Sequence, residues 1–244
     1  MDYISICSPN YLHDAHIRFG LRSDCDVICE KPLVVNPWNL DGIQSIEESS
    51  GRKLNAILQL RVHPNVLRLK GKVERELSET KKVIDLTYIT PRGRWYDVSW
   101  KGVLEKSGGI VTNIGVHFFD MLGWIYGDVQ DSQVYHRQPK SASGVLEYND
   151  AVVNWYLSTD GNDLSLLNKD STKPFRSLTI DDEEFDFSLG FNDLHTLSYE
   201  QILLGNGFGV EDSRPSIETV FDIKTMKIRD SKDGHWFLRK KGGA

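Results

Sequence analysis

The first sixty residues alternate between short apolar runs and amphipathic segments, and this alternation constrains the fold more than any other feature. The apolar runs have the length of buried strands, and the segments between them carry apolar residues at helical spacing. The predicted elements are strand Tyr3–Cys7, helix Tyr11–Leu21, strand Asp26–Cys29, helix Asn36–Ser49 and strand Leu54–Leu60. Such an order is typical of a parallel sheet covered by helices.

The pattern of elements changes after residue 62. An amphipathic helix, 64–77, leads into a strand, 83–90, and then into a polar, aromatic loop, 91–107. Further on we predict helix 108–126, strands near 132–137, 145–148, 152–158, 177–180 and 185–187, and helices 195–204 and 217–228. A run of strands beside helices indicates an α+β unit with one large, mostly antiparallel open sheet flanked by helices. The expected fold class is therefore α/β followed by α+β, in two domains, 1–62 and 63–244.

The predicted parallel unit begins without a glycine-rich turn. A doubly wound dinucleotide-binding domain opens with a strand and a G-x-G-x-x-G turn, and an acidic residue for the ribose follows about 20 residues later. No such motif precedes Tyr3, and the similar run Gly205–Gly209 follows a predicted helix rather than a strand. We therefore expect residues 1–62 to be the C-terminal half of a Rossmann-type domain whose N-terminal half, roughly 70 residues, is absent.

The composition excludes several classes of protein. Hydrophobic residues make up 39% of the 244, and the net charge of −6 argues against a general nucleic-acid or anionic-membrane surface. No run reaches transmembrane length, and the start does not resemble a signal peptide. The three cysteines lack the spacing of a zinc site, so we expect no metal and a reducing compartment, the cytoplasm.

Two segments carry a resemblance to a known family. One is the Glu-Lys-Pro motif within Cys29–Leu33, and the other is Ser107–Asp120, which opens with Gly-Gly and ends in Gly-x-His-x-x-Asp. In this order and spacing the chain resembles the family of glucose–fructose oxidoreductase, inositol dehydrogenase and the rhizopine-catabolism proteins (Gfo/Idh/MocA). The resemblance covers essentially the whole chain. It implies a nicotinamide-dependent oxidoreductase with a Rossmann-type domain that binds NAD and a second domain that binds substrate and forms oligomers.

Further segments resemble a subfamily that acts on a UDP-linked sugar acid. The resemblance implies hydride transfer from C3 of UDP-N-acetylglucosaminuronic acid to NAD, in the synthesis of lipopolysaccharide O-antigen sugars. It also implies a homo-oligomer, a tetramer formed through the open sheets of the second domain. The family's usual Asp, four residues before the motif histidine, is Asn113 here, as expected of this subfamily. The segments are Ile6–His13, Asn36–Leu40, Ile57–Arg61 and Asp85–Thr90.

Lys31 and His117 are the predicted catalytic residues. Oxidation of a sugar alcohol needs a hydride acceptor, a proton acceptor and groups that hold the C–H bond over the nicotinamide. Lys31 follows the carboxyl end of a strand, where open α/β sheets bind ligands, and its cation would polarise the reacting hydroxyl. Histidine as a residue type titrates near the working pH, so His117 is predicted to act as the general base. The alternatives are a surface lysine in a turn and a core histidine.

Substrate-binding residues are predicted on the same helix and in the loop before it. Asn113 shares a helix face with the motif histidine and Trp124, and it would orient the sugar through hydrogen bonds without adding charge. Arg92, Arg94 and Lys101 lie in the aromatic loop and would bind the diphosphate and carboxylate, with Arg94 as the carboxylate ligand. The alternative, which explains these cations equally well, is a charged loop that faces solvent and binds no ligand.

The turns after the first two predicted strands are the expected cofactor contacts. The resemblance implies that they line NAD near its ribose and nicotinamide. They contribute Ser8, Pro9, Asn10, His13, Glu30 and Lys31. A helix-start or turn role alone would also explain Asn10.

Two other functions compete with this interpretation. The first is the same chemistry on another sugar or on inositol, which an Asp in place of Asn113 would have favoured. The second is a truncated, non-catalytic protein that binds a partner or a sugar, because the pyrophosphate would lose its glycine-rich turn and helix N-terminus. On that ground we expect this chain alone to bind NAD weakly or not at all.

Overall fold

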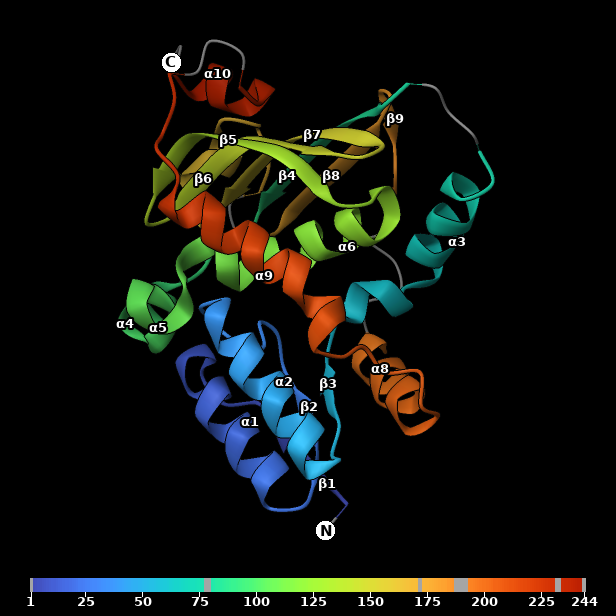
Figure 1. Cartoon of the computed structure of the whole chain (residues 1–244). Coiled ribbons are helices and arrows are strands. Elements are labelled where there is room, and N and C mark those ends of the chain that lie inside the picture. Colours follow the sequence, from blue (N-terminus) through green and yellow to red (C-terminus); the bar gives the residue numbers. More distant parts are fainter. Residues whose placement is uncertain (1, 77–79, 171–172, 187–192, 231–233, 243–244) are drawn as a thin grey trace.

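Two β-sheets organise the chain, one of three strands and one of six (Figure 1). The structure, a computed structural model, describes residues 2–76, 80–170, 173–186, 193–230 and 234–242. Helix α9 (Val210–Thr225) runs between the sheets and contacts both α2 below it and β5 above it. The cavity described below lies where the two sheets approach each other.

The smaller sheet is formed by the alternating segments at the start of the chain. Strands β1 (Tyr3–Ile6), β2 (Asp26–Cys29) and β3 (Leu54–Ala56) lie in that order, and each neighbouring pair is parallel. Helices α1 (His13–Arg22) and α2 (Trp38–Ser50) make the crossovers and lie side by side on one face (Figure 1). The prediction of a parallel α/β sheet is confirmed.

The ends of two predicted elements differ from the structure. The prediction extends the third strand to Leu60, whereas β3 ends at Ala56 and a 3-10 turn, η2 (Gln59–Val62), follows. The prediction starts the first helix at Tyr11, whereas a 3-10 turn, η1 (Asn10–Leu12), precedes α1. The turn η1 contacts the segment Leu104–Ser107, and η2 contacts the helix Val116–Tyr126.

Later parts of the chain return to both faces of the small sheet. On the face of α1 and α2, α9 contributes Val210 and Ile217 to the same apolar cluster. On the opposite face, Ile202 of α8 (Leu194–Leu203) packs with Ile28 and Ile57. The core of the small sheet is therefore completed by residues that lie beyond residue 190 in the sequence.

The larger sheet has the strand order β5-β6-β7-β4-β8-β9. The β4–β7 pair is parallel and the other neighbouring pairs are antiparallel. The strands are β4 (Lys82–Ile89), β5 (Val129–Gln138), β6 (Ser141–Tyr148), β7 (Ala151–Ser158), β8 (Phe175–Ile180) and β9 (Glu183–Glu184). The predicted, mostly antiparallel sheet is confirmed.

The last predicted strand, 185–187, needs a correction. Asp181 and Asp182 have φ values of 50° and 67°, so they form a tight hairpin turn that brings β9 back beside β8. The strand accordingly lies at 183–184, Phe185 follows it, and residue 187 lies outside the described residues.

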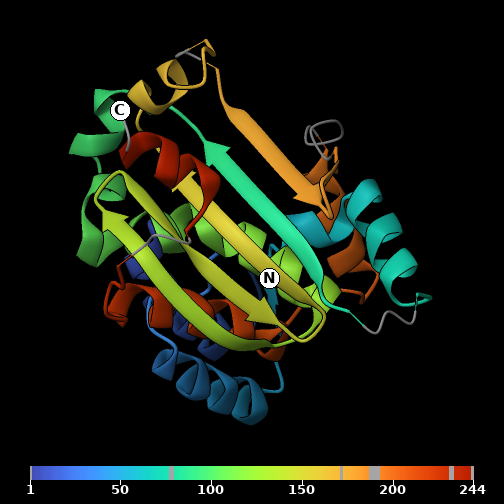
Figure 2. The same ribbon diagram turned by 90° about the horizontal axis from the view of Figure 1, so that it is seen from above.

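The inner face of the larger sheet carries the main apolar core. It packs on α6 (Val116–Tyr126) and α9, with α3 (Pro64–Val73) at the edge. Leu86 and Trp155 are register partners on β4 and β7, and both are fully buried there. On the outer face, α10 (Trp236–Gly242) covers one end of the sheet (Figure 2) through Phe237.

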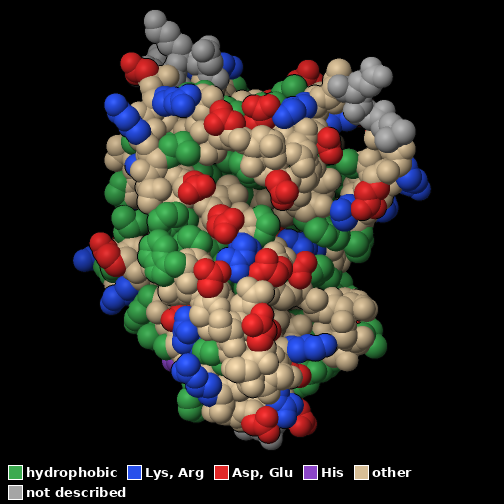
Figure 3. Space-filling model, viewed as in Figure 1, with side chains coloured by type: hydrophobic (Ala, Val, Ile, Leu, Met, Phe, Trp, Pro, Cys, Tyr) green, Lys and Arg blue, Asp and Glu red, His purple; other side chains and the backbone are tan. Residues whose placement is uncertain are grey.

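A run of short elements, residues 92–107, forms what we call the wall segment. It contains α4 (Arg94–Val98), η3 (Trp100–Gly102) and α5 (Leu104–Ser107). Exposed apolar side chains lie along it, and hydrophobic side chains gather on the left of the face in Figure 3, toward the side where α4 and α5 lie. The small helix α7 (Asn162–Ser165) follows β7.

The predicted helix 108–126 is not one regular helix. Residues Val111–Gly115 form a π-helix, η4, in which the N–H of Val116 bonds the carbonyl of Val111. Such wide turns inside helices occur frequently at functional sites. Here it immediately precedes α6, the helix that carries His117.

The described residues show neither a membrane-spanning helix nor a metal cluster. Across 2–76, 80–170, 173–186, 193–230 and 234–242, no helix is both long and apolar enough to cross a membrane. Within the same ranges, no three His, Cys, Asp or Glu side chains gather so that they could hold a metal ion. All three cysteines are free thiols.

Candidate active site

Lys31 and His117 line one cavity of about 280 Å³ at the junction of the two sheets. Its size is close to the lower end of small-molecule sites. The loop after β2, the turn η2, the wall segment, the η4–α6 helix and strands β4 and β8 all contribute to it. The lining residues are Lys31, Gln59, Leu60, Tyr88, Arg92, Tyr96, Lys101, Asn113, Ile114, His117, Phe118 and Arg176.

Lys31 is held directly beyond the carboxyl end of β2. Its Nζ donates a hydrogen bond of 2.9 Å to the backbone carbonyl of Asn113, inside the π-helix. The pKa of Lys31 is lowered to about 8, chiefly by burial and also by the positive charges of Lys101 and Arg92, against the opposing charge of Glu30. The ammonium group is therefore present at neutral pH, but it gives up its proton more readily than an exposed lysine.

His117 lies one turn beyond the π-helix, on α6. Burial lowers the pKa of His117 well below its ordinary value, and the charges of Lys31 and His195 act in the same direction. The imidazole is therefore neutral at physiological pH, which is the form that accepts a proton. A neutral imidazole beside an ammonium group is suited to removing a proton from an alcohol that the cation polarises.

Asn113 connects three parts of the site. Its Oδ1 accepts a bond of 3.4 Å from Nδ2 of Asn10, in the turn after β1, and its Nδ2 donates at 2.9 Å to the hydroxyl of Tyr96, in the wall segment. With the bond from Lys31, this residue joins the two expected cofactor turns to the wall segment. Its proposed role in orienting the sugar stays a prediction.

The cavity is strongly cationic. Lys31, Arg92, Lys101 and Arg176 all line it, and its lining within the described residues includes no Asp or Glu. Arg176, on β8, was missed by sequence reasoning because a single arginine in a short strand carries no motif. Such a wall favours an anionic ligand.

One substrate-binding residue of the predicted site, Arg94, lies elsewhere. Arg94 is exposed at the beginning of α4 and is not part of this lining, so the wall segment contributes Arg92 and Lys101 instead. Trp124, on the same helix as His117, does not line the cavity; its ring lies 5.6 Å from Cζ of Arg61. The face that Asn113, His117 and Trp124 are predicted to share stays a prediction.

The expected cofactor residues gather at the carboxyl ends of β1 and β2. Ser8 and Pro9 form the turn after β1, where the Oγ of Ser8 bonds Nδ1 of His16 at 2.9 Å. Asn10 is buried, and its Nδ2 donates to the carbonyl of Ser107 at 3.0 Å. This edge of a parallel sheet is where open α/β folds bind dinucleotides, and its polar side chains fit that use.

His13 and Glu30 fix these turns in place. Both ring nitrogens of buried His13 lie 2.7 Å from carbonyl oxygens, those of Pro32 and Ser8, so the ring joins the two turns. Burial lowers the pKa of His13. Glu30 bonds Nε2 of His195 on α8 at 2.9 Å. Direct contact of either residue with a cofactor stays a prediction.

A buried ion pair supports the cavity from behind. The guanidinium of Arg61, on η2, binds both carboxylate oxygens of Asp120, on α6, at 3.0 and 2.8 Å. It also donates to the backbone carbonyl of Asp212, on α9, at 2.8 Å. Arg61 and Asp120 both lie in segments that carry the family resemblance, and that is the signal by which sequence could have found the pair.

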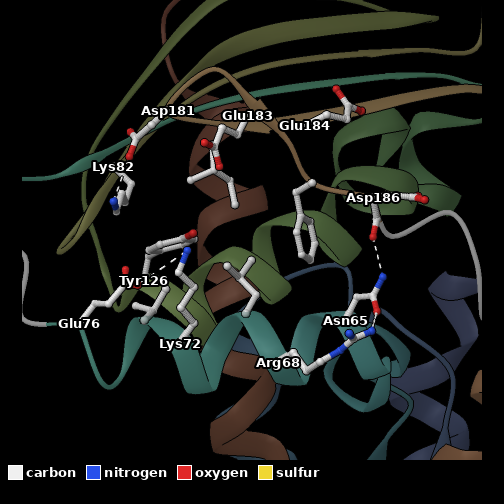
Figure 4. Close-up of a pocket in the computed structure, with 14 residues that line it drawn as sticks. Asn65, Arg68, Lys72, Glu76, Lys82, Tyr126, Asp181, Glu183, Glu184 and Asp186 are labelled. Atoms are coloured by element: carbon white, nitrogen blue, oxygen red, sulfur yellow. Dashed lines mark hydrogen bonds and ion pairs between the residues drawn. The ribbon is translucent and has the colours of Figure 1, made fainter.

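Two larger cavities lie outside this group. One of about 910 Å³ adjoins the wall segment and shares Tyr96 and Lys101 with the site. Another, of about 560 Å³, lies between α3 and the β8–β9 hairpin (Figure 4). Acidic side chains outnumber basic ones around the second cavity, where Lys82 and Asp181 form an ion pair of 3.0 Å. Neither contains Lys31 or His117.

Comparison with known proteins gives two family matches. Residues 1–57 match the oxidoreductase family model of the NAD-binding Rossmann fold, and residues 80–171 match the model of the C-terminal alpha/beta domain of the same family. These matches support the expected Rossmann-type fold and NAD as the cofactor class.

Solved structures agree with the family matches. The WlbA (WbpB) dehydrogenase from Thermus thermophilus, in complexes with NAD and alpha-ketoglutarate or with NAD and UDP-GlcNAcA, is 40% identical, with a TM-score of 0.91. That match covers 98% of this chain and 77% of the other. WlbA from Bordetella pertussis, at 16% identity and a TM-score of 0.74, covers 92% of this chain and 77% of its own, and it shows the shared fold alone.

Curated relatives match over a shorter stretch. D-glucoside 3-dehydrogenase from Escherichia coli (strain K12) is 28% identical over 132 residues, which are 52% of this chain and 36% of that protein. The chain spans about a third of the length of the curated relatives it matches. Together with the motifs around Lys31 and His117, these findings show that the chain belongs to the Gfo/Idh/MocA oxidoreductase family, whose members join an NAD-binding Rossmann fold to a C-terminal alpha/beta domain.

Proposed function

We propose that this protein oxidises the C3 hydroxyl of UDP-N-acetylglucosaminuronic acid with NAD as hydride acceptor. The observation that carries the proposal is the cavity in which Lys31 and His117 meet, with three further cations and no acidic residue in its described lining. A sugar nucleotide acid carries a diphosphate and a carboxylate, which match that charge. Further support comes from the 40% identity to a dehydrogenase whose complex contains NAD and UDP-GlcNAcA.

In the proposed reaction the two catalytic side chains act on one hydroxyl. Lys31 donates a hydrogen bond to the C3 oxygen and stabilises the negative charge that develops there. His117, neutral because of its burial, accepts the hydroxyl proton. When bound, NAD supplies the hydride acceptor for the hydrogen on C3. Ser8, Pro9, Asn10, His13 and Glu30, at the ends of β1 and β2, would hold the cofactor.

The test is a single turnover with NAD in large excess over the protein, because this chain is expected to bind NAD weakly. UDP-N-acetylglucosaminuronic acid deuterated at C3 is mixed with the purified protein, and NADH formation is followed by its absorbance. Mass spectrometry then locates the deuterium, which we expect on the NADH. Deuterium that stayed on an oxidised sugar would refute C3, and wild-type protein that formed no NADH with this sugar would refute the function. A Lys31→Met variant serves as the inactive control.

Other parts of the proposal concern the setting of the enzyme. We place the domain boundary at residue 62, and we propose a homo-tetramer formed through the outer face of the larger sheet, where Val83 is 51% exposed. The proposed place is the cytoplasm, in the synthesis of lipopolysaccharide O-antigen sugars. Sedimentation of the purified protein tests the subunit number.

A further inference from the structure

The cations of the cavity lie on two separate walls. Arg92 and Lys101 belong to the wall segment, and both lie near enough to Lys31 to lower its pKa. Arg176 lies on β8, where it is the register partner of Tyr88 on β4. Because the side chain of Tyr88 packs in the core on the inner face of the sheet, its register partner points to the same side, toward the cavity.

An aromatic ring supports the guanidinium of Arg176. Its Cζ lies 5.4 Å from the centroid of the Tyr88 ring, which in turn lies 5.0 Å from the ring of Phe118 on α6. Stacking on a ring restricts the plane of the guanidinium, and a guanidinium of fixed plane binds a carboxylate through two parallel hydrogen bonds. The side chain is half-buried, so such bonds would be only partly screened by water.

The proposed substrate has anionic groups at two places on its ring. The diphosphate is attached to C1 and the carboxylate to C5, and each of these carbons is two positions from C3. When C3 faces Lys31 and His117, the two anions therefore lie toward the far end of the ring, one on each side of the line from C3 to the ring oxygen. The two cationic walls of the cavity match this division.

We propose, on the basis of the proposed function, that Arg176 is the specificity residue that binds the C5 carboxylate of the sugar acid. Arg92 and Lys101 then face the diphosphate on C1. This assignment replaces Arg94, whose exposed position at the beginning of α4 is outside the cavity. It would account for the preference for an acid over a neutral sugar that the proposed function requires.

The test compares two ligands that differ at C6. UDP-N-acetylglucosaminuronic acid and UDP-N-acetylglucosamine, which has a hydroxymethyl group instead of the carboxylate, are titrated calorimetrically into the protein in the presence of NAD. The variants are Arg176→Gln, Arg176→Lys and Arg94→Gln, with Arg22→Gln on the exposed end of α1 as the control. Thermal melting checks that each variant is folded.

We expect Arg176→Gln to weaken binding of the acid about 10- to 100-fold, the usual effect of losing a hydrogen bond between charged groups, and to leave the neutral sugar unaffected. Arg176→Lys keeps the charge but loses the paired geometry, so its loss is smaller. Equal losses for both sugars, or a selective loss in Arg94→Gln instead, would overturn the role of Arg176. Wild-type protein without any preference for the acid would overturn the proposed substrate, and the carboxylate site with it.

Discussion

The Nζ of Lys31 lies 2.9 Å from the backbone carbonyl oxygen of Asn113 and donates a hydrogen bond to it. This bond joins the loop after β2 to the π-helix before α6. It therefore holds the ammonium group of Lys31, which follows the small sheet, near the imidazole of His117, which lies on a helix packed on the larger sheet. Because the partner is a carbonyl and not a carboxylate, no full negative charge offsets the effect of burial at this contact. The pKa of Lys31 is accordingly lowered to about 8.

The first prediction concerns the pH dependence of the proposed oxidation. Lys31 is protonated below its pKa and neutral above it, so kcat/KM should fall as the pH rises through about 8. His117 is neutral far below pH 6.5, so no second decrease is expected between pH 6 and 7. Steady-state or single-turnover rates between pH 6 and 10 give the profile. A rate that kept rising to pH 10 would contradict the role of the lysine cation.

The second prediction concerns the proton acceptor. His117→Asn keeps a polar side chain of similar size but removes the base, so we expect kcat to fall roughly 10²- to 10⁴-fold with little change in KM. His136→Asn, on β5 and outside the cavity, is the control and should keep the wild-type rate. If the loss appeared in KM alone, His117 would be a binding group and not the base.

The third prediction tests the charge at position 113. Asn113→Asp places a carboxylate in the environment of Lys31, which favours the protonated lysine and should move the alkaline limb of the pH profile upward by roughly one unit. The same carboxylate repels the anionic substrate, so its KM should rise. Asn162→Asp, exposed on α7, is the matched control. If the alkaline limb of the pH profile were unchanged in Asn113→Asp, a group other than Lys31 would be responsible for that limb.

The fourth prediction concerns stability. The side chains of Arg61 and Asp120 are 6% and 3% exposed, so removal of one partner leaves a buried charge without compensation. We expect Arg61→Ala to lower the free energy of unfolding by about 3–5 kcal/mol, measured by urea denaturation. Removing the exposed pair of Arg52 and Asp24 with Arg52→Ala should cost less than about 1 kcal/mol. Similar losses of unfolding free energy in both variants would mean that burial does not determine how much an ion pair contributes to stability.

Local sequence patterns predicted much of the fold. The strands and helices of the first sixty residues alternate with clear periodicity, and β1, β2 and β3 follow it. Lys31 and His117 were singled out because each lies in a short motif, and both line one cavity in the structure. Their roles in catalysis stay predictions.

Features that depend on tertiary contacts were not predictable in the same way. The π-helix at Val111–Gly115, immediately before the helix of His117, has no sequence signal of its own. Arg92 and Arg94 are two residues apart in a loop without periodicity, so nothing local shows that Arg92 reaches the cavity and Arg94 does not. The position of Arg176 in the cavity follows only from the pairing of β8 with β4, which no local sequence pattern predicts.

The contacts of Arg61 bear on how ligands reach the cavity. This one guanidinium holds η2 to α6 and α9, and the rings of Trp124 and Phe208 lie 5.6 and 4.9 Å from it. Any hinge motion that moved the small sheet away from α6 would have to break the two hydrogen bonds from Arg61 to Asp120. We therefore expect the two sheets to keep their relative orientation when a ligand binds. Entry of a substrate would then depend on rearrangement of side chains at the opening of the cavity.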